Sequence, residues 1–365
     1  SLDEGAVNLQ EVVVTALGIK KESKAIGYSV SQVKGDDVAK SHETNLANAL
    51  SGKISGVFVS RPASGAAGSS KVVIRGNNSL RTNSQPLYVV DGVPITNLSS
   101  DASTQWGGFD YGDGISNINP EDIETMSVLK GPNATALYGQ RGNNGVILIT
   151  TKSGTQKKKI GVNFSSDYSV GTGLVLPDFQ NEYGQGYNGT FTNFKGNDGK
   201  VYTMANATAL GIAGMPQASA GRDKLTRGSW GAKMDGQQYM DQFGNVSTFD
   251  PQSNTYDFFE PDKTFTNNLS IDGGTGKTNY RFSASNTHNN GYVPSNNMDR
   301  NTFNLKVNSE LTTKLHFEAM ANYINQRVVN RPRLSDANDN PAYLFISMPR
   351  SMSLASLQNY TWTQE

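Results

Sequence analysis

Cysteine is absent from this 365-residue chain, which excludes a disulfide framework and thiolate metal sites. Histidine occurs only at His42, His288 and His316, and this spacing fits no metal site. An excess of charge is also missing, because 32 basic residues balance 32 acidic ones, so nothing favours binding to nucleic acid. The sequence holds no Ser–His–Asp or nucleophile-elbow pattern. We therefore predict a protein that is not an enzyme and that needs no metal or cofactor.

Long hydrophobic runs are missing as well. No stretch of about 18 apolar residues occurs, which excludes a membrane-spanning helix. A transmembrane β-barrel remains possible, because its strands alternate apolar and polar residues and keep the mean hydropathy, here -0.50, low. The first residues have neither the basic nor the apolar part of a signal peptide. If the protein is exported, we expect the chain to begin after processing or inside a longer polypeptide.

What the sequence has in abundance is glycine, with 38 residues, and short β-prone runs. The pattern predicts an α/β domain over residues 25–155, after an N-terminal extension at 1–24. A helix is expected at Thr44–Leu50 and a helical turn at Pro120–Ile123. Strands are expected at Val57–Val59, Lys71–Arg75, Leu87–Val90, Glu124–Leu129 and Val146–Thr151. Asp91-Gly92 has the chemistry of a tight turn.

The pattern changes after residue 155. Five further strands are expected, at Asn163–Val170, Thr264–Asp272, Lys277–Asn286, Thr302–Leu311 and Leu315–Asn325, and four of the five keep period-two alternation over most of their length. Each is close to the ~9–11 residues that a tilted membrane strand needs. Short links at 273–276 and 312–314 alternate with long links at 171–263, 287–301 and 326–365. This asymmetry favours an outer-membrane barrel, with short periplasmic turns and long outer loops, over the alternative of a soluble β-sandwich.

Several motifs of the α/β domain occur together in a specific order. They are Val72–Gly76 (VVIRG), Leu87–Pro94 (LYVVDGVP) and the block Ile123–Lys152, which contains LKGPNATALYGQRG. In order and spacing they resemble the plug domain of TonB-dependent outer-membrane transporters, and the wording YVVDGVPI resembles the SusC branch of that family. Ser229–Gln237 and Gly291–Asn304 also resemble SusC-type segments. The resemblance implies a plug followed by the first strands, about five, of an antiparallel barrel of about 22 strands, so the chain is expected to be the front portion of a longer one.

The resemblance also implies site residues. The TonB box, which pairs with a strand of TonB, would fall at Leu9, Gln10, Glu11, Val12, Val13, Val14 and Thr15; an ordinary edge strand is the alternative. Arg75 and Arg141 match plug arginines that form a latch with barrel glutamates, which would lie outside this chain. The alternative is that both arginines only serve the plug's own turns. Trp106, Phe109 and Tyr111 lie in a glycine-rich plug loop and could face substrate, although ordinary packing explains them nearly as well.

The resemblance implies active import of a bulky nutrient, an oligosaccharide or a peptide, across the bacterial outer membrane. The implied partners are TonB with its inner-membrane motor, a SusD-like surface lipoprotein that acts as a lid, the substrate and the lipid bilayer. The plug and N-terminus would face the periplasm, with the long loops outside. Two alternatives stay open: a receptor for a small chelate such as a siderophore or cobalamin, and a scaffolding barrel in a larger outer-membrane complex.

Overall fold

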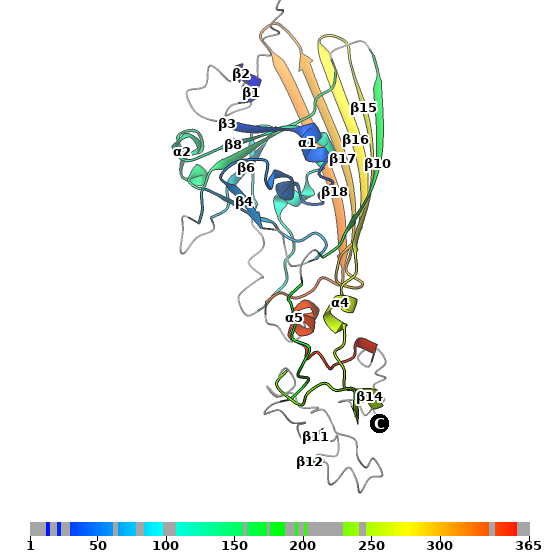
Figure 1. The fold of residues 1–365 in the computed structure, drawn as a ribbon. Coiled ribbons are helices and arrows are strands. Elements are labelled where there is room, and N and C mark those ends of the chain that lie inside the picture. The colour runs from blue at the N-terminus through cyan, green and yellow to red at the C-terminus, as the bar shows by residue number, and fades with distance from the viewer. Residues whose placement is uncertain are drawn as a thin grey trace, which may run out of the picture. The chain divides into compact units, whose positions relative to one another are not determined.

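The computed structural model describes residues 12–14, 20–22, 30–60, 65–77, 84–97, 107–155, 159–173, 176–186, 194–195, 201–202, 229–240, 246–335 and 340–355. The chain divides into two compact units (Figure 1). The larger unit comprises residues 1–171, 262–291 and 295–334, and the smaller one comprises 172–261, 292–294 and 335–365. Among the described residues, no helix is long and apolar enough to cross a membrane.

The first part of the larger unit is an α/β domain around a five-stranded sheet. Its strand order is β3-β8-β9-β6-β7, with β9 parallel to β6 and antiparallel to β8. The bounds are β3 Val30–Lys34, β6 Leu87–Val90, β7 Val93–Ile95, β8 Ile123–Leu129 and β9 Val146–Thr151. The run VILITT forms the central strand, because a continuous apolar run can be buried on both faces.

Smaller elements cover both faces of this sheet. They are α1 (Gly35–Ala39), α2 (Pro132–Tyr138), the paired strands β4 (Val57–Ser60) and β5 (Lys71–Ile74), and the 3-10 helices η3 (Leu46–Leu50), η4 (Gly114–Asn117), η5 (Pro120–Asp122) and η6 (Gly139–Gly142). One core contains Leu46, Leu50, Tyr88, Ile115 and Ile147, all fully buried. A second core lies on the other face, where Val89 and Leu148 pack with Ala134 of α2. N-terminal to this domain, β1 (Val12–Val14) pairs with β2 (Lys20–Glu22).

The second part of the larger unit is an antiparallel sheet of long strands in the order β10-β15-β16-β17-β18 (Figure 1). Their bounds are β10 Gly161–Gly171, β15 Asp262–Gly274, β16 Thr278–Asn290, β17 Asn297–Glu310 and β18 His316–Val329. All five predicted strands are present, and each is longer than predicted. We call this sheet the wall; its strands form part of a barrel and do not close into one.

The two faces of the wall differ in polarity. A row of mostly large apolar side chains faces outward across the register, namely Phe164, Leu269, Ala284, Phe303 and Tyr323. The exposed fractions of the four large side chains run from 38% at Leu269 to 64% at Phe164. The opposite face carries buried polar residues that include Asn268, Ser270, Ser283, Thr302 and Lys306. This inverts the pattern of a soluble sandwich, which buries its apolar face, and it is the pattern of a membrane barrel strand.

Two expectations differ from the structure. The segment Thr44–Leu50, predicted as a helix, forms the short 3-10 helix η3 at Leu46–Leu50. Asn45 caps its start by accepting a hydrogen bond from Ala47 N, and the turn ends at Ser51. The link predicted as long at 287–301 is only the turn 291–296, because β16 and β17 continue pairing up to Asn290 and Asn297. The polar side chains at these strand ends led to the prediction of a loop.

The smaller unit contains β11 (Phe194–Lys195), β12 (Val201–Tyr202), β13 (Gln238–Met240), β14 (Val246–Thr248), α4 (Asn254–Phe258) and α5 (Pro341–Ile346). Its core packs Tyr239 against Phe249, with ring centroids 4.9 Å apart, beside Ala232 and Met234. The hydroxyl of Tyr239 donates to the carbonyl of Ser351 at 2.9 Å. The segment Ser229–Gln237 therefore helps to build this core.

Candidate functional site: the plug–wall interface

The α/β domain contacts the polar face of the wall through hydrogen bonds and ion pairs, beside a small apolar cluster of Ala66, Ala67, Met298 and Val328. Burying a charged group is costly unless it is paired and hydrogen-bonded, so such contacts must be specific to persist. Three clusters of this kind connect the two parts. They centre on Asp122, on Lys306 and on Arg300.

Asp122 ends η5 and is the most connected carboxylate of the interface. The turn is built locally, because Asn119 caps it by accepting from Glu121 N and Pro120 occupies its first position. The Asp122 carboxylate, only 4% exposed, then accepts from Arg281 Nη2 at 3.0 Å and from Ser283 Oγ at 2.7 Å. It also accepts from Asn304 Nδ2 at 2.6 Å. Three side chains of β16 and β17 thus converge on one plug carboxylate.

Lys306 of β17 forms the second cluster. Its ammonium lies 3.2 Å from Asp91 Oδ1 and 3.3 Å from Glu318 Oε1. The turn after β6 positions Asp91, which has a φ of 45°, and its carboxylate also accepts from the backbone N–H and the hydroxyl of Thr151. Lys306 donates to that hydroxyl at 3.2 Å. Lys306 therefore contacts the ends of both β6 and β9 and joins them to the wall.

Arg300 of β17 is 5% exposed and binds plug carbonyls instead of a carboxylate. Its guanidinium donates to Thr44 O at 3.2 Å and to Ser116 O. Both carbonyls belong to segments joined by Asp113, which caps η4 and accepts from Asn45 Nδ2 at 3.1 Å. Planar guanidinium groups suit such multiple contacts because their donors are held in a fixed fork.

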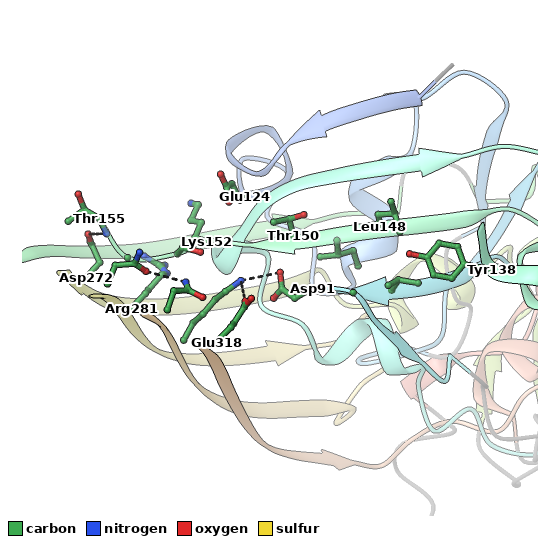
Figure 2. A pocket seen from close by; sticks show the side chains of 18 residues that line it. Asp91, Glu124, Tyr138, Leu148, Thr150, Lys152, Thr155, Asp272, Arg281 and Glu318 are labelled. Atoms are coloured by element: carbon green, nitrogen blue, oxygen red, sulfur yellow. Dashed lines mark hydrogen bonds and ion pairs between the residues drawn. The ribbon is translucent and has the colours of Figure 1, made fainter. Parts of the chain in front are cut away.

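A cavity of about 680 Å³ lies between the plug sheet and the wall (Figure 2). Its lining is highly charged and includes Asp91, Glu124, Lys152, Asp272 and Lys306. Thr155 N donates to Asp272 Oδ2 at 3.4 Å, which joins the segment after β9 to the wall. Among the described residues, no cluster of three or more His, Asp or Glu side chains has the geometry of a metal site.

The interface also includes the turn between β16 and β17. Asn296 accepts from Ala66 N at 2.7 Å and donates to Val329 O at 3.0 Å, so one amide joins the plug to two wall strands. A Cβ at Gly65, which has a φ of 77°, would lie 2.2 Å from Asn296 Oδ1. The segment Gly291–Asn304, which the sequence marks as SusC-type, therefore contains three residues that hold the plug, Asn296, Arg300 and Asn304.

The predicted site residues fall in several places. Arg75, which has a φ of 60°, follows β5 and lies near Gly131, and Arg141 lies exposed in η6. In the part of the chain that the structure describes, neither arginine forms an ion pair, so the latch with external glutamates stays a prediction. Phe109 and Tyr111 are 36% and 59% exposed. Trp106 lies outside the described residues, as does the predicted TonB box apart from Val12–Val14.

The residues that hold the plug to the described wall were not predicted. Here the cations Arg281, Arg300 and Lys306 come from the wall, and the acids Asp91 and Asp122 come from the plug. The available signal was the position of these cations on the polar face of alternating strands. A charged residue there that points toward the plug needs a partner.

Comparison with known proteins agrees with this architecture. Residues 22–146 match the TonB-dependent receptor plug domain. The chain is 40% identical over 161 residues to the TonB-dependent receptor SusC of Bacteroides thetaiotaomicron, which covers 44% of this chain and 15% of SusC. The chain corresponds to part of a SusC-like TonB-dependent receptor. Relatives of this SusC-like receptor are outer-membrane receptors and transporters, not enzymes.

Two further similarities show how much of its relatives the chain covers. The structure of the RagAB peptide importer in its open-open state matches this chain with a TM-score of 0.58 and 23% identity. The match covers 88% of this chain and 33% of the importer chain, which shows a shared fold. The ferric enterobactin receptor PirA of Pseudomonas aeruginosa is 31% identical over 157 residues, covering 20% of PirA. The chain thus matches a third or less of the length of these relatives.

Proposed function

We propose that this SusC-like receptor actively imports a bulky nutrient, an oligosaccharide or a peptide, across the bacterial outer membrane. The observation that carries the proposal is the set of hydrogen bonds and ion pairs that hold the plug against the wall. A plug that must move is best held by hydrogen bonds and ion pairs that water can replace, because separating two apolar surfaces costs about 25 cal/mol per Å² of apolar area exposed. The clusters around Asp122, Lys306 and Arg300 are contacts of that replaceable kind.

The outward apolar row of the wall supports contact with the lipid bilayer. In the proposed orientation, the plug and the N-terminus face the periplasm and the long loops face outward. The N-terminal extension at 1–24, the plug at 25–155 and the wall with its loops at 156–365 are the proposed functional parts.

Energy would come from TonB, which we propose pairs with Leu9–Thr15. The backbone at Val12–Val14 is extended and pairs with Lys20–Glu22. Such a short two-stranded ribbon is marginal in water, so a partner strand can replace it. Arg75 and Arg141 would meet glutamates of the remaining barrel and release them when the plug moves.

A SusD-like lipoprotein is the proposed outer lid. The support is the likeness to SusC and to the fold of the RagAB peptide importer. A chelate receptor is the second candidate, supported by the likeness to PirA, whose printed name is a ferric enterobactin receptor. A purely scaffolding barrel is the third, and it would need no energy coupling.

The test is a deletion of residues 9–15 in the full-length receptor, with uptake measured on a panel of glycans, peptides and ferric chelates. A deletion of the same length at residues 2–8 serves as the control. We expect the first deletion to abolish uptake of one nutrient class, with outer-membrane levels unchanged, and the control to retain it. Normal uptake of every nutrient after removal of the box would favour the scaffold.

A further inference from the structure

Four charged side chains form a row across the inner face of the wall, where they line the cavity of about 680 Å³ (Figure 2). Asp272 of β15 lies directly opposite Arg281 of β16 in the strand register, and Arg281 lies opposite Lys306 of β17. Glu318 of β18 completes the row, because its Oε1 atom lies 3.3 Å from the ammonium of Lys306. The signs along this charged row are negative, positive, positive and negative, so the wall carries one acid for each of these two cations.

The plug supplies another acid for each cation of the charged row. Arg281 Nη2 donates to Asp122 Oδ1 at 3.0 Å, and the ammonium of Lys306 lies 3.2 Å from Asp91 Oδ1. Like charges that lie directly opposite each other in a sheet repel, so the two neighbouring cations are stable only with acids close by. With the plug in place, each cation therefore has a plug carboxylate as a partner.

The wall acids stand ready to take over this role. Glu318 already shares Lys306 with a plug carboxylate. Asp272 forms no ion pair among the described residues, and its carboxylate instead accepts from Thr155 N at 3.4 Å. Because side chains that lie directly opposite on one face of a sheet are within reach of each other, Asp272 can pair with Arg281 once that arginine turns along the wall. The adjoining cavity gives both side chains room to turn.

The third cluster of the interface lacks this arrangement. Arg300 lies opposite Thr287 and Gln326 in the strand register, and neither of these carries a charge. Its partners in the plug are carbonyl groups. Displacing the plug at this point leaves the guanidinium without a carboxylate. Of the three clusters, those of Asp122 and Lys306 thus allow an exchange of ionic partners and that of Arg300 does not.

We propose that the charged row is an ion-pair exchange site, at which the wall takes back its cations when the plug is displaced; the inference rests on the proposed import function. Arg281 turns from Asp122 to Asp272 as the plug moves. Lys306 releases its plug partner and keeps Glu318. Each cation thus passes from a plug carboxylate to a wall carboxylate, and the plug is released first beside the cavity, where this exchange is possible.

The exchange predicts the sign of the effect when a wall acid is lost. With Asp272 or Glu318 made neutral, the displaced plug leaves a cation without its wall partner, and the plug carboxylates no longer meet a competing negative charge. The plug should therefore be held more tightly, whereas the loss of a merely structural contact would loosen it. Cross-strand pairs of opposite charge are worth a change of about two- to fivefold in an equilibrium, and we expect an effect of that size.

The test measures hydrogen exchange of the plug segment 119–129 in the full-length receptor, purified in detergent. Asp272→Asn keeps an oxygen that can accept from Thr155 N but removes the charge opposite Arg281. We expect the opening equilibrium of this segment to fall about two- to fivefold. Glu318→Gln should lower the opening of the segment 87–92 in the same way.

Two further variants separate the exchange from other effects of lost charge. Asp299→Asn is the matched control, because it removes an acid from the outward face of the wall, where Asp299 pairs with His288 at 2.6 Å. It should leave the exchange of the plug unchanged. In an Arg281→Gln background, Asp272→Asn should lose most of its effect, because the cation that changes partners is gone.

An unchanged or higher opening of the plug in Asp272→Asn would overturn the proposal. An equal fall in opening in Asp272→Asn and in Asp299→Asn would overturn it as well. Uptake that requires residues 9–15, together with unchanged opening in Asp272→Asn, would overturn the ion-pair exchange alone. Uptake independent of residues 9–15 would overturn the import function itself, and this inference with it.

Discussion

Replacing Asp122 with asparagine should loosen the plug at its most connected contact. The substitution keeps the size of the side chain but removes the charge opposite Arg281, whose side chain is only 12% exposed. It also turns one acceptor oxygen into a donor that faces Ser283 or Asn304, which are themselves donors to this carboxylate. Breaking a buried ion pair from one side costs about 3–5 kcal/mol. Because asparagine retains one acceptor, we expect about 3 kcal/mol.

Hydrogen exchange measures this loss directly. Since about 1.4 kcal/mol corresponds to a factor of ten, the opening equilibrium of the plug segment 119–129 should rise about 10²-fold in the full-length receptor. The control is Asp36→Asn, because Asp36 is 79% exposed and lies 3.5 Å from Lys152. An exposed pair of this kind contributes little, so its exchange should change by about fivefold or less.

The double variant Asp122→Asn with Arg281→Gln separates the pair from its surroundings. If the unpaired arginine causes the loss, the double variant should lose less protection than the two single variants added together. Wild-type protection in Asp122→Asn would refute the assignment of Asp122 as the anchor.

Two further predictions concern the plug itself. Gly35→Ala should destabilise the plug by about 1–3 kcal/mol, because the added Cβ would lie 1.8 Å from the carbonyl oxygen of Ile123. Gly52→Ala is the control: its Cβ meets no atom within 4 Å, so it should cost less despite the φ of 71°. Thermal unfolding compares the two variants, and equal losses of stability would contradict the packing argument. Burial raises the pKa of Glu121, so its contribution to stability is present below the ordinary pKa of 4.5 and is lost as pH rises through the folded-state value. Glu121→Gln should therefore raise the melting temperature more at pH 7 than at pH 4, and an equal change at both would count against this reasoning.

Much of the fold could be predicted because local patterns are strong. The apolar run at Val146–Thr151 predicted a strand of the sheet, and alternation predicted four of the wall strands and which face of each is apolar. Strand ends were harder to predict, because Asn289, Asn290 and Asn297 read as loop residues. The structure shows that backbone pairing with the neighbouring strand continues through them.

The candidate site was less predictable than the fold. Recognition of motifs pointed to Arg75 and Arg141, which conform to a family pattern that depends on barrel segments beyond those described. The described anchors Arg281 and Lys306 lie in no motif, and Arg300 lies in the SusC-type segment Gly291–Asn304 without any role having been predicted for it. Each reads in sequence as a polar residue on the inner face of a strand, and such residues are commonly solvated in a barrel lumen.

The sequence by itself determined the order of elements, the plug motifs and the opposite polarity of the two wall faces, because these depend on residues close together along the chain. Only the tertiary structure decided which polar residue meets which partner. Asp122 lies far in sequence from Arg281, Ser283 and Asn304, and it meets them because strand register places Ser283 opposite Asn304, with Arg281 two positions along β16. Long-range pairing of this kind leaves no periodic trace in the sequence, since one plug turn contributes a single residue and the two strands contribute one or two each.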